Sequence, residues 1–350
     1  MKFVRRAAQA ATLLALVLLA GCADLARTSK PVAVAQLPPS PTPGATPHPS
    51  AVVKASPTPT PTTIPSPTLS ASLTPTPNPS ATLRASPTRT PSSTPGCAEA
   101  AGRIDGGQLP SAIASGGQVA YAIYFPPCYD TRVRYPVAYL MHGSPNFDER
   151  HWLELGLKEA LDQAIASRRV PPFVVVLPRG DVNGSYGNTS GGAGSWEQVM
   201  IEELIPYVDT VYNTLGSKEG RAIGGISRGA VWALEIAFRN PDLFSAVGGH
   251  SPALAVSLAG PAFDPIDLAQ TDQAQALRGT RIYLDAGDRD WALQQAAELH
   301  AILDEQGVPN TFVVGRGTHV ADYWTSQLEA YVGFYGSTFD GLVELGAVPY

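Results

Sequence analysis

A serine flanked by glycines follows a short apolar run in the middle of the chain. The pentapeptide Gly225-Ile226-Ser227-Arg228-Gly229 continues the run that starts at Ala222, and apolar residues then recur at helical spacing as far as Phe238. Strand, sharp turn and helix with a serine at the apex form the layout of a nucleophile elbow. The glycines remove bulk where strand and helix nearly touch. Ser227 is the only serine with glycine at both −2 and +2, so we take it as the candidate nucleophile. The alternative interpretation is a plain strand-to-helix turn.

A serine hydroxyl needs a base within hydrogen-bond reach, and the base needs an acid that orients it. The layout around Ser227 resembles that of α/β-hydrolases, in which the acid and then the histidine follow the serine along the chain. His319 fits this order, because it is the last histidine and ends the glycine-rich loop 315–319. His250, at the end of a strand, is the alternative base. Of the remaining histidines, His142 precedes a turn and His48 lies in the proline-rich segment. His151 and His300 are interpreted as surface or packing residues.

The acid is expected on the loop that follows the strand between Ser227 and His319. Three aspartates compete there: Asp285 within the strand, and Asp288 and Asp290 in the loop. Asp290 also has a structural interpretation, because aspartate is a favoured N-cap for the helix that follows.

Acyl transfer also needs hydrogen-bond donors for the oxyanion. One donor is the backbone N–H after the nucleophile, which belongs to Arg228, and the second comes from the loop after an early strand. The sequence His142-Gly143-Ser144 ends such a strand. We therefore expect the Ser144 N–H to be the second donor, with His142 packing against the turn.

Strands that alternate with helices must position these groups. Apolar runs predict strands, and apolar residues at helical spacing predict helices. The predicted strands are residues 119–125, 137–142, 173–177, 222–226, 244–249, 281–286 and 311–314, and the predicted helices are residues 153–168, 197–212, 230–238, 291–306 and 321–335. Such alternation predicts an α/β fold with a mostly parallel sheet covered on both faces. Ligands of such sheets bind beyond the carboxyl ends of the strands, where Ser227 lies.

The chain begins with a segment that we do not assign to the fold. Lys2, Arg5 and Arg6 precede an apolar stretch that is too short for a stable membrane span. The sequence Leu19-Ala20-Gly21-Cys22 resembles the lipobox of bacterial lipoproteins. Residues 1–21 are therefore predicted to be a lipoprotein signal peptide, and Cys22 a lipidated residue that anchors the protein to the cell membrane, facing outside the cytoplasm. The alternative is an ordinary signal peptide.

Residues 22–96 are predicted to be a disordered linker. The segment from Pro31 to Gly96 contains 18 of the chain's 33 prolines, no aromatic residue and no acid. It cannot bury enough apolar area to offset its ordering entropy, so we expect an extended tether. A docking site for a proline-recognition module is the alternative.

Residues 97–350 are predicted to form one domain. Two cysteines remain there, Cys97 and Cys128, and an exported protein meets an oxidising environment, so we expect a disulfide between them. Two buried free thiols are the alternative. The net charge of −6 argues against nucleic acid as a partner.

Several motifs across residues 119–335 follow one another in the order of a known family. They are Tyr139-Leu140-Met141-His142-Gly143; Trp196 with Glu203-Leu204-Ile205-Pro206; Gly224-Gly225-Ile226-Ser227-Arg228-Gly229; Asn240-Pro241-Asp242-Leu243-Phe244; Ser251-Pro252; Asp285-Ala286-Gly287-Asp288-Arg289-Asp290; and Gly317-Thr318-His319 with Trp324. Together they resemble the esterase D family of α/β-hydrolases, which includes feruloyl and acetylxylan esterases, enterochelin esterases and the antigen 85 mycolyltransferases.

The resemblance implies an α/β-hydrolase fold and a serine carboxylic-ester hydrolase with a Ser-His-Asp triad. The acid of this family stands three residues after the loop glycine, here Gly287, which favours Asp290 over Asp288. Ala230 departs from the family pattern, where many members carry another glycine. The implied substrate is a small-molecule or polysaccharide-linked ester, and no metal or cofactor is implied. Two alternatives stay open: an acyltransferase of the same fold and a non-catalytic surface binding module.

Overall fold

The computed structural model describes residues 99–114, 116–144, 148–180, 191–257 and 259–344. The predicted signal peptide, Cys22, the tether and Cys97 lie outside these residues. In the part of the chain that is described, no helix is both long enough and apolar enough to cross a membrane.

One sheet of eight strands runs through the domain in the order β1-β2-β4-β3-β5-β6-β7-β8. β1 and β2 pair antiparallel, β2 and β4 pair antiparallel, and every later pairing is parallel. The strands are β1 (Arg103–Pro110), β2 (Gln118–Phe125), β3 (Val137–Met141), β4 (Val174–Pro178), β5 (Arg221–Ile226), β6 (Ala246–His250), β7 (Arg281–Gly287) and β8 (Asn310–Gly315).

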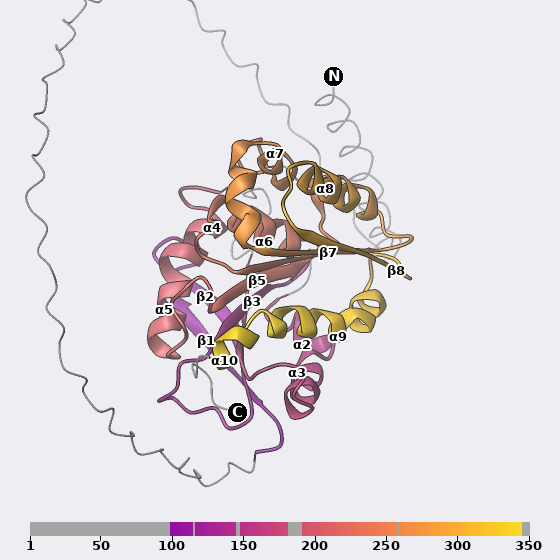
Figure 1. Cartoon of the computed structure of the whole chain (residues 1–350). Coiled ribbons are helices and arrows are strands. Elements are labelled where there is room, and N and C mark those ends of the chain that lie inside the picture. Colours follow the sequence, from indigo (N-terminus) through magenta and orange to yellow (C-terminus); the bar gives the residue numbers. More distant parts are fainter. Residues whose placement is uncertain (1–98, 115, 145–147, 181–190, 258, 345–350) are drawn as a thin grey trace, which may run out of the picture. The chain divides into compact units, whose positions relative to one another are not determined.

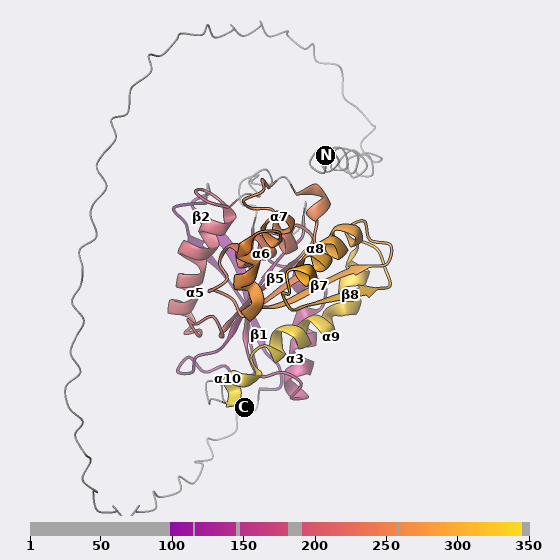
Figure 2. The same cartoon turned by 45° about the horizontal axis from the view of Figure 1, so that its top comes forward.

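Helices cover both faces of this sheet (Figures 1 and 2). One layer contains α4 (Trp196–Gln198), η2 (Val199–Leu204), α5 (Ile205–Val211), α6 (Arg228–Arg239), α7 (Pro265–Ala269) and α8 (Leu293–Glu305). The other contains α2 (His151–Glu154), α3 (Leu157–Ala166) and α9 (Ala321–Ser337), with α10 (Asp340–Glu344) at its end. The short helices η3 (Leu254–Val256) and η4 (Asp272–Gly279) lie between β6 and β7, on either side of α7.

The two layers follow from the alternation of side chains along each strand. In β3, Tyr139 and Met141 pack into the core under α6, whereas Ala138 and Leu140 pack into the core under α3 and α9. Both sets are buried because a central parallel strand has helices on both sides. This arrangement confirms the predicted fold class: an α/β-hydrolase fold with a mostly parallel sheet.

Two predicted helices are interrupted. Gly156, at φ 95°, separates α2 from α3, because its left-handed backbone cannot continue a helix. The predicted helix 197–212 changes to π-type bonding over η2 before α5 begins. Pro206, in the first turn of α5, has no N–H to donate to the preceding turn, which removes one regular helical bond there.

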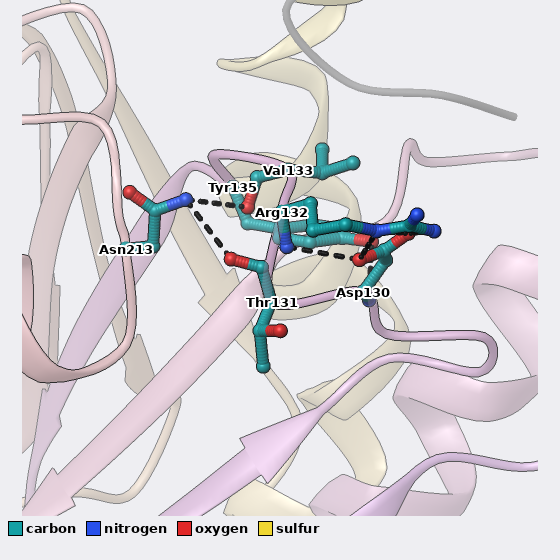
Figure 3. A network of polar contacts seen from close by, with 6 residues as sticks. All are labelled: Asp130, Thr131, Arg132, Val133, Tyr135 and Asn213. Carbon is teal, nitrogen blue, oxygen red and sulfur yellow. Dashed lines mark hydrogen bonds and ion pairs between the residues drawn. The ribbon is translucent and has the colours of Figure 1, made fainter.

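Asn213 helps to hold the loop between β2 and β3 to the end of α5 (Figure 3). The Asn213 amide donates to the backbone oxygens of Thr131 and Val133, at 3.2 and 3.3 Å. Asn213 has φ 51°, a conformation that asparagine tolerates better than most residues. The same loop contains Cys128, which is disulfide-bonded.

The carboxyl ends of four parallel strands meet at one edge of the sheet. Ile226 at the end of β5 pairs with His250 of β6, and His250 pairs with Asp285 of β7. Gly287 in turn pairs with Gly315 at the end of β8. The loops that carry Ser227, Asp290 and His319 therefore leave the sheet side by side.

Candidate active site

Ser227 lies at the apex of a sharp turn between β5 and α6. Its backbone has φ 57° and ψ −113°, which an L-residue adopts only under constraint from its surroundings. The constraint is visible in the backbone: the Ser227 N–H donates to His250 O at 2.9 Å, and the Ala253 N–H donates to Ser227 O at 3.1 Å.

The flanking glycines permit this turn through their lack of side chains. A Cβ on Gly225 would lie 2.3 Å from the backbone carbon of Gly229, and a Cβ on Gly229 would lie 2.4 Å from His142 O. Strand, helix and the loop after β3 therefore approach one another at contact distance, which explains the small residues at these positions.

His319 lies between Ser227 and Asp290. Its Nε2 is 2.8 Å from Ser227 Oγ, and its Nδ1 is 2.9 and 3.1 Å from the two carboxylate oxygens of Asp290. With Nδ1–H donating to Asp290, Nε2 carries the lone pair that accepts from the Ser227 hydroxyl. The 92 residues that separate serine and histidine in the chain are thus bridged by one hydrogen bond.

Asp290 is set up to remain ionised although it is buried. Burial raises its pKa, but the hydrogen bond and charge of His319, the Ala292 N–H and the Ser251 hydroxyl outweigh burial and hold the pKa below its ordinary value. The Ala292 N–H donates to Asp290 Oδ1 at 2.7 Å, just before α8 begins. Asp290 therefore has both roles considered for it: it binds the backbone at the start of the helix and it faces the histidine.

The two other aspartates of the loop have different partners. Asp288 accepts from the Gly317 N–H at 2.9 Å, and its side chain is 47% exposed. Asp285 is fully buried and lies 2.7 Å from Nδ1 of His250. His250, the alternative base, is completely buried and has Tyr335 on its other ring nitrogen at 2.8 Å, so neither nitrogen is directed at Ser227.

The two candidate oxyanion donors come from adjacent strands. Arg228 is the first residue of α6, so its N–H points out of the helix N-terminus. Ser144 follows β3, which pairs with β5 through Met141 and Gly225. The Ser144 hydroxyl oxygen is buried with no hydrogen-bond partner among the residues described.

The side chain of Arg228 packs against the loop after β6. The residue is buried, and its guanidinium donates to Val256 O at 3.3 Å. Arg228 therefore contributes its backbone to the turn and its side chain to the loop after β6.

Two histidines support the loop that carries Ser144. His142 is buried with Nε2 3.3 Å from Gly180 O, which agrees with packing against the turn. The Gly143 N–H donates to Nδ1 of His151 at 3.2 Å. Burial first, and the neighbouring His142, lower the pKa of His151 to about 4, so His151 is neutral and able to accept. The sequence predicts that His151 is a surface or packing residue, and the residue is buried. The sequence does not predict the contact with Gly143, because the two residues lie on different elements.

Two tryptophans enclose the ring of His319. Trp291 lies against its face, with ring centroids 4.3 Å apart and planes at 36°, and Trp324 meets it edge-on at 5.1 Å and 84°. Trp291 follows Asp290 directly in the sequence, which is the one signal that could have indicated its position beside the histidine. No cluster of three or more His, Cys, Asp or Glu side chains that could hold a metal ion occurs among the described residues.

Comparison with known proteins adds to this geometry. A family model described as "Putative esterase" matches residues 113–335. The chain is 37% identical over 116 residues to an endo-1,4-β-xylanase/feruloyl esterase of Xylanibacter ruminicola, and 31% identical over 134 residues to an esterase of Mycobacterium tuberculosis. These segments cover 32% and 37% of this chain, and the chain spans only 16% and 28% of those two proteins.

Solved structures are similar over about two thirds of the chain. A ferulic acid esterase is 26% identical with a TM-score of 0.62, and the match covers 68% of this chain and 100% of that one. An S-formylglutathione hydrolase of Staphylococcus aureus has a TM-score of 0.56 at 16% identity, covering 67% of this chain and 98% of the other. The second similarity bears on the fold alone. The family match, the two related enzymes and the ferulic acid esterase support ester hydrolysis.

Proposed function

The chain belongs to the putative esterase family, and on that premise we propose that its α/β domain is a serine carboxylic-ester hydrolase that works through an acyl-enzyme. The observation that carries the proposal is the continuous hydrogen-bonded path from Ser227 Oγ through the His319 ring to Asp290, with contacts of 2.8 and 2.9 Å. Nucleophile, base and acid within this reach are what acyl transfer to serine requires.

In the first half of the reaction, Ser227 Oγ attacks the carbonyl carbon of the ester and its proton passes to Nε2 of His319. Asp290 stabilises the imidazolium that forms, since its low pKa keeps it ionised. The negative charge on the carbonyl oxygen is met by the backbone N–H groups of Arg228 and Ser144. Collapse of the tetrahedral intermediate breaks the ester C–O bond, and the leaving alcohol takes the proton from His319.

In the second half, water replaces the alcohol. His319 removes a proton from the water, the hydroxide oxygen bonds to the acyl carbon, and the same two N–H groups hold the oxyanion. Breaking the bond to Ser227 Oγ releases the carboxylic acid and returns the proton to serine. No further reactant is needed.

The substrate class follows the relatives' names. Feruloyl and ferulic acid esterases among them favour a small-molecule or polysaccharide-linked ester as the substrate.

The proposed location is outside the cytoplasm, with lipidated Cys22 as membrane anchor. Replacing Cys22 by serine should then release the protein from the membrane fraction and abolish incorporation of labelled fatty acid.

The catalytic proposal is tested with Ser227→Ala. Wild type should hydrolyse p-nitrophenyl acetate and methyl ferulate and react with a fluorophosphonate probe, whereas the variant should do neither and should keep its circular dichroism spectrum. Mass spectrometry should locate the probe on the peptide that contains Ser227. Full activity of the variant would overturn the proposal, and product analysis with added acceptor sugars separates hydrolysis from acyl transfer.

A further inference from the structure

The chain turns sharply behind Ser227, at His250 and Ser251. The turn binds both backbone polar groups of the nucleophile: His250 O accepts from the Ser227 N–H, and the Ala253 N–H donates to Ser227 O. The turn is itself fixed to β7, since the Ser251 N–H donates to Asp285 O at 2.8 Å. The backbone of the nucleophile is therefore positioned by His250 and Ala253, which lie on either side of Ser251 in the turn.

The side chain of Ser251 reaches toward the base. Ser251 is completely buried and has φ 48°, a left-handed conformation that costs a non-glycine residue about 1 kcal/mol or more and persists only where the surroundings enforce it. Its Oγ accepts a hydrogen bond from Nε1 of Trp324 at 3.1 Å. A hydroxyl that accepts one bond still has its own proton to donate, and hydrogen bonding from Ser251 contributes to the low pKa of Asp290.

Both partners of the Ser251 hydroxyl touch His319. Asp290 binds Nδ1 of the histidine, and the indole of Trp324 lies edge-on against its ring at 5.1 Å. Trp324 is only 3% exposed, so the indole has little room to move once its N–H is bound. The orientation of the imidazole thus depends on two contacts that meet at one hydroxyl.

A rigid polar cluster lies beneath this turn. Asp285 accepts hydrogen bonds from the hydroxyls of Tyr323 and Tyr331, at 2.7 and 2.8 Å, and pairs with His250. Both tyrosines belong to α9, the helix that also carries Trp324. Asp285 therefore binds both α9 and the turn at Ser251. The contact between Ser251 and Trp324 joins the same two elements, each of which is already held by Asp285.

We propose that Ser251 is a positioning residue of the reaction: its hydroxyl couples the turn that holds the Ser227 backbone to Trp324 and Asp290, which orient His319. The inference rests on the proposed function. Ser251 touches neither substrate nor the reacting atoms and acts through the geometry of the two groups on either side of the histidine.

The first test is Ser251→Ala, assayed on p-nitrophenyl acetate across pH. We expect kcat to fall about fivefold to tenfold, the range for loss of one positioning hydrogen bond, with KM within about twofold of wild type. The acid limb of kcat/KM should move to higher pH, because a carboxylate that loses a donor stabilises the imidazolium more strongly. Tyr323, the other titratable group close to Asp290, stays neutral because burial and Asp285 raise its pKa.

A second variant separates the hydroxyl from the backbone strain. Ser251→Gly removes the same hydroxyl but relieves the left-handed conformation, so it should be the more stable of the two variants. Both should nevertheless show the same kinetic defect and the same pH displacement. Ser326→Ala is the matched control. It removes a serine hydroxyl that lies on α9, two residues from Trp324, and it should leave kcat and the pH profile unchanged.

The pairing with Trp324 is tested by a double-mutant cycle. Trp324→Phe keeps an aromatic ring but lacks the N–H donor, and its effect should be strongly non-additive with Ser251→Ala. Unchanged kcat and an unchanged acid limb in both Ser251 variants, with Ser227→Ala inactive, would overturn this inference and leave the proposed function standing. An active Ser227→Ala would instead overturn the proposed function itself.

Discussion

Asp288 and Asp290 lie two residues apart on the loop after β7, yet their carboxylates face different partners. Asp290 binds Nδ1 of His319 and is buried, whereas Asp288 binds the Gly317 N–H and is half-exposed. Asp288 thereby holds the loop that carries the histidine, and Asp290 holds the histidine itself.

Replacing each aspartate by asparagine should therefore separate the two roles. Asp290→Asn should lower kcat by about 10³- to 10⁴-fold, because an amide cannot stabilise the imidazolium and favours the wrong tautomer. Asp288→Asn should lower it by less than about threefold, because the amide oxygen can still accept from the Gly317 N–H. Steady-state kinetics with one ester substrate measure both. Equal losses in the two variants would contradict the assignment of the acid.

Trp291 should hold the ring of His319 in place. Its indole lies against the imidazole face, with ring centroids 4.3 Å apart. Trp291→Leu should then lower kcat by about twofold to tenfold, because an aromatic pair of this kind contributes about 0.5–1.5 kcal/mol. Trp291→Phe keeps a ring and should lower kcat less. Steady-state kinetics measure both, and a leucine variant with the kcat of wild type would show that the stacking does not position the histidine.

Gly229 should be intolerant of any side chain. A Cβ at this position would lie 2.4 Å from His142 O and 2.5 Å from Met141 O, and backbone atoms cannot move aside easily. We expect Gly229→Ala to lower the Tm by several degrees and kcat by more than about tenfold, since the turn and the loop of Ser144 must separate.

Gly333→Ala is the matched control for this substitution. It lies in α9 with open space around it, so alanine should stabilise the protein by about 0.5–1 kcal/mol through its higher helix propensity. A Gly229→Ala protein as active and as stable as Gly333→Ala would contradict the close approach described for the turn.

Glu235 on α6 should make the stability of the domain depend on pH. Burial, and then the neighbouring Glu197, raise its pKa to about 8, and one of its oxygens has no hydrogen-bond partner among the described residues. The other charged groups near it are Arg239, which pairs with Glu197 at 3.3 Å, and Asp264 before α7. Burial and the neighbouring carboxylates outweigh the one guanidinium, which keeps Glu235 protonated near neutral pH.

The sign of this effect follows from proton binding. Between its ordinary value of 4.5 and about 8, Glu235 is protonated in the folded state and ionised in the unfolded state, so the free energy of unfolding falls as pH rises. Glu235→Gln should remove this dependence and gain in Tm over wild type from pH 5 to pH 8. The exposed Glu202→Gln should track wild type throughout. A Tm gap that is constant with pH would show that Glu235 is ionised in the folded protein.

The sequence predicts the central elements of the fold well because their signals are local. The buried run at β4 and the strand, turn and helix around Ser227 are recognisable from neighbouring residues alone. The sequence does not predict β1, because this segment contains two glycines and a proline and most of its residues are exposed. It becomes a strand through pairing with β2, which a local pattern does not contain.

The same distinction applies to the candidate site. Ser227, His319 and the aspartate loop can be proposed from motifs and chain order, but the partners of His151, Ser251 and the tryptophans depend on which loops meet in space. The choice between Asp288 and Asp290 needed either the family resemblance or the hydrogen bonds of the folded loop. Spatial contacts between distant elements are what the sequence patterns leave undetermined.

The direction of β2 has a consequence for how the domain can be attached. β2 runs antiparallel to β4, so Phe125 lies at the amino end of the parallel strands, and the disulfide-bonded Cys128 follows it. Ser227 lies at the opposite, carboxyl end. A mechanical load applied through Cys128 would therefore enter the sheet at the end remote from the reacting groups, and a bulky insoluble substrate could approach the catalytic edge while the domain is held from behind.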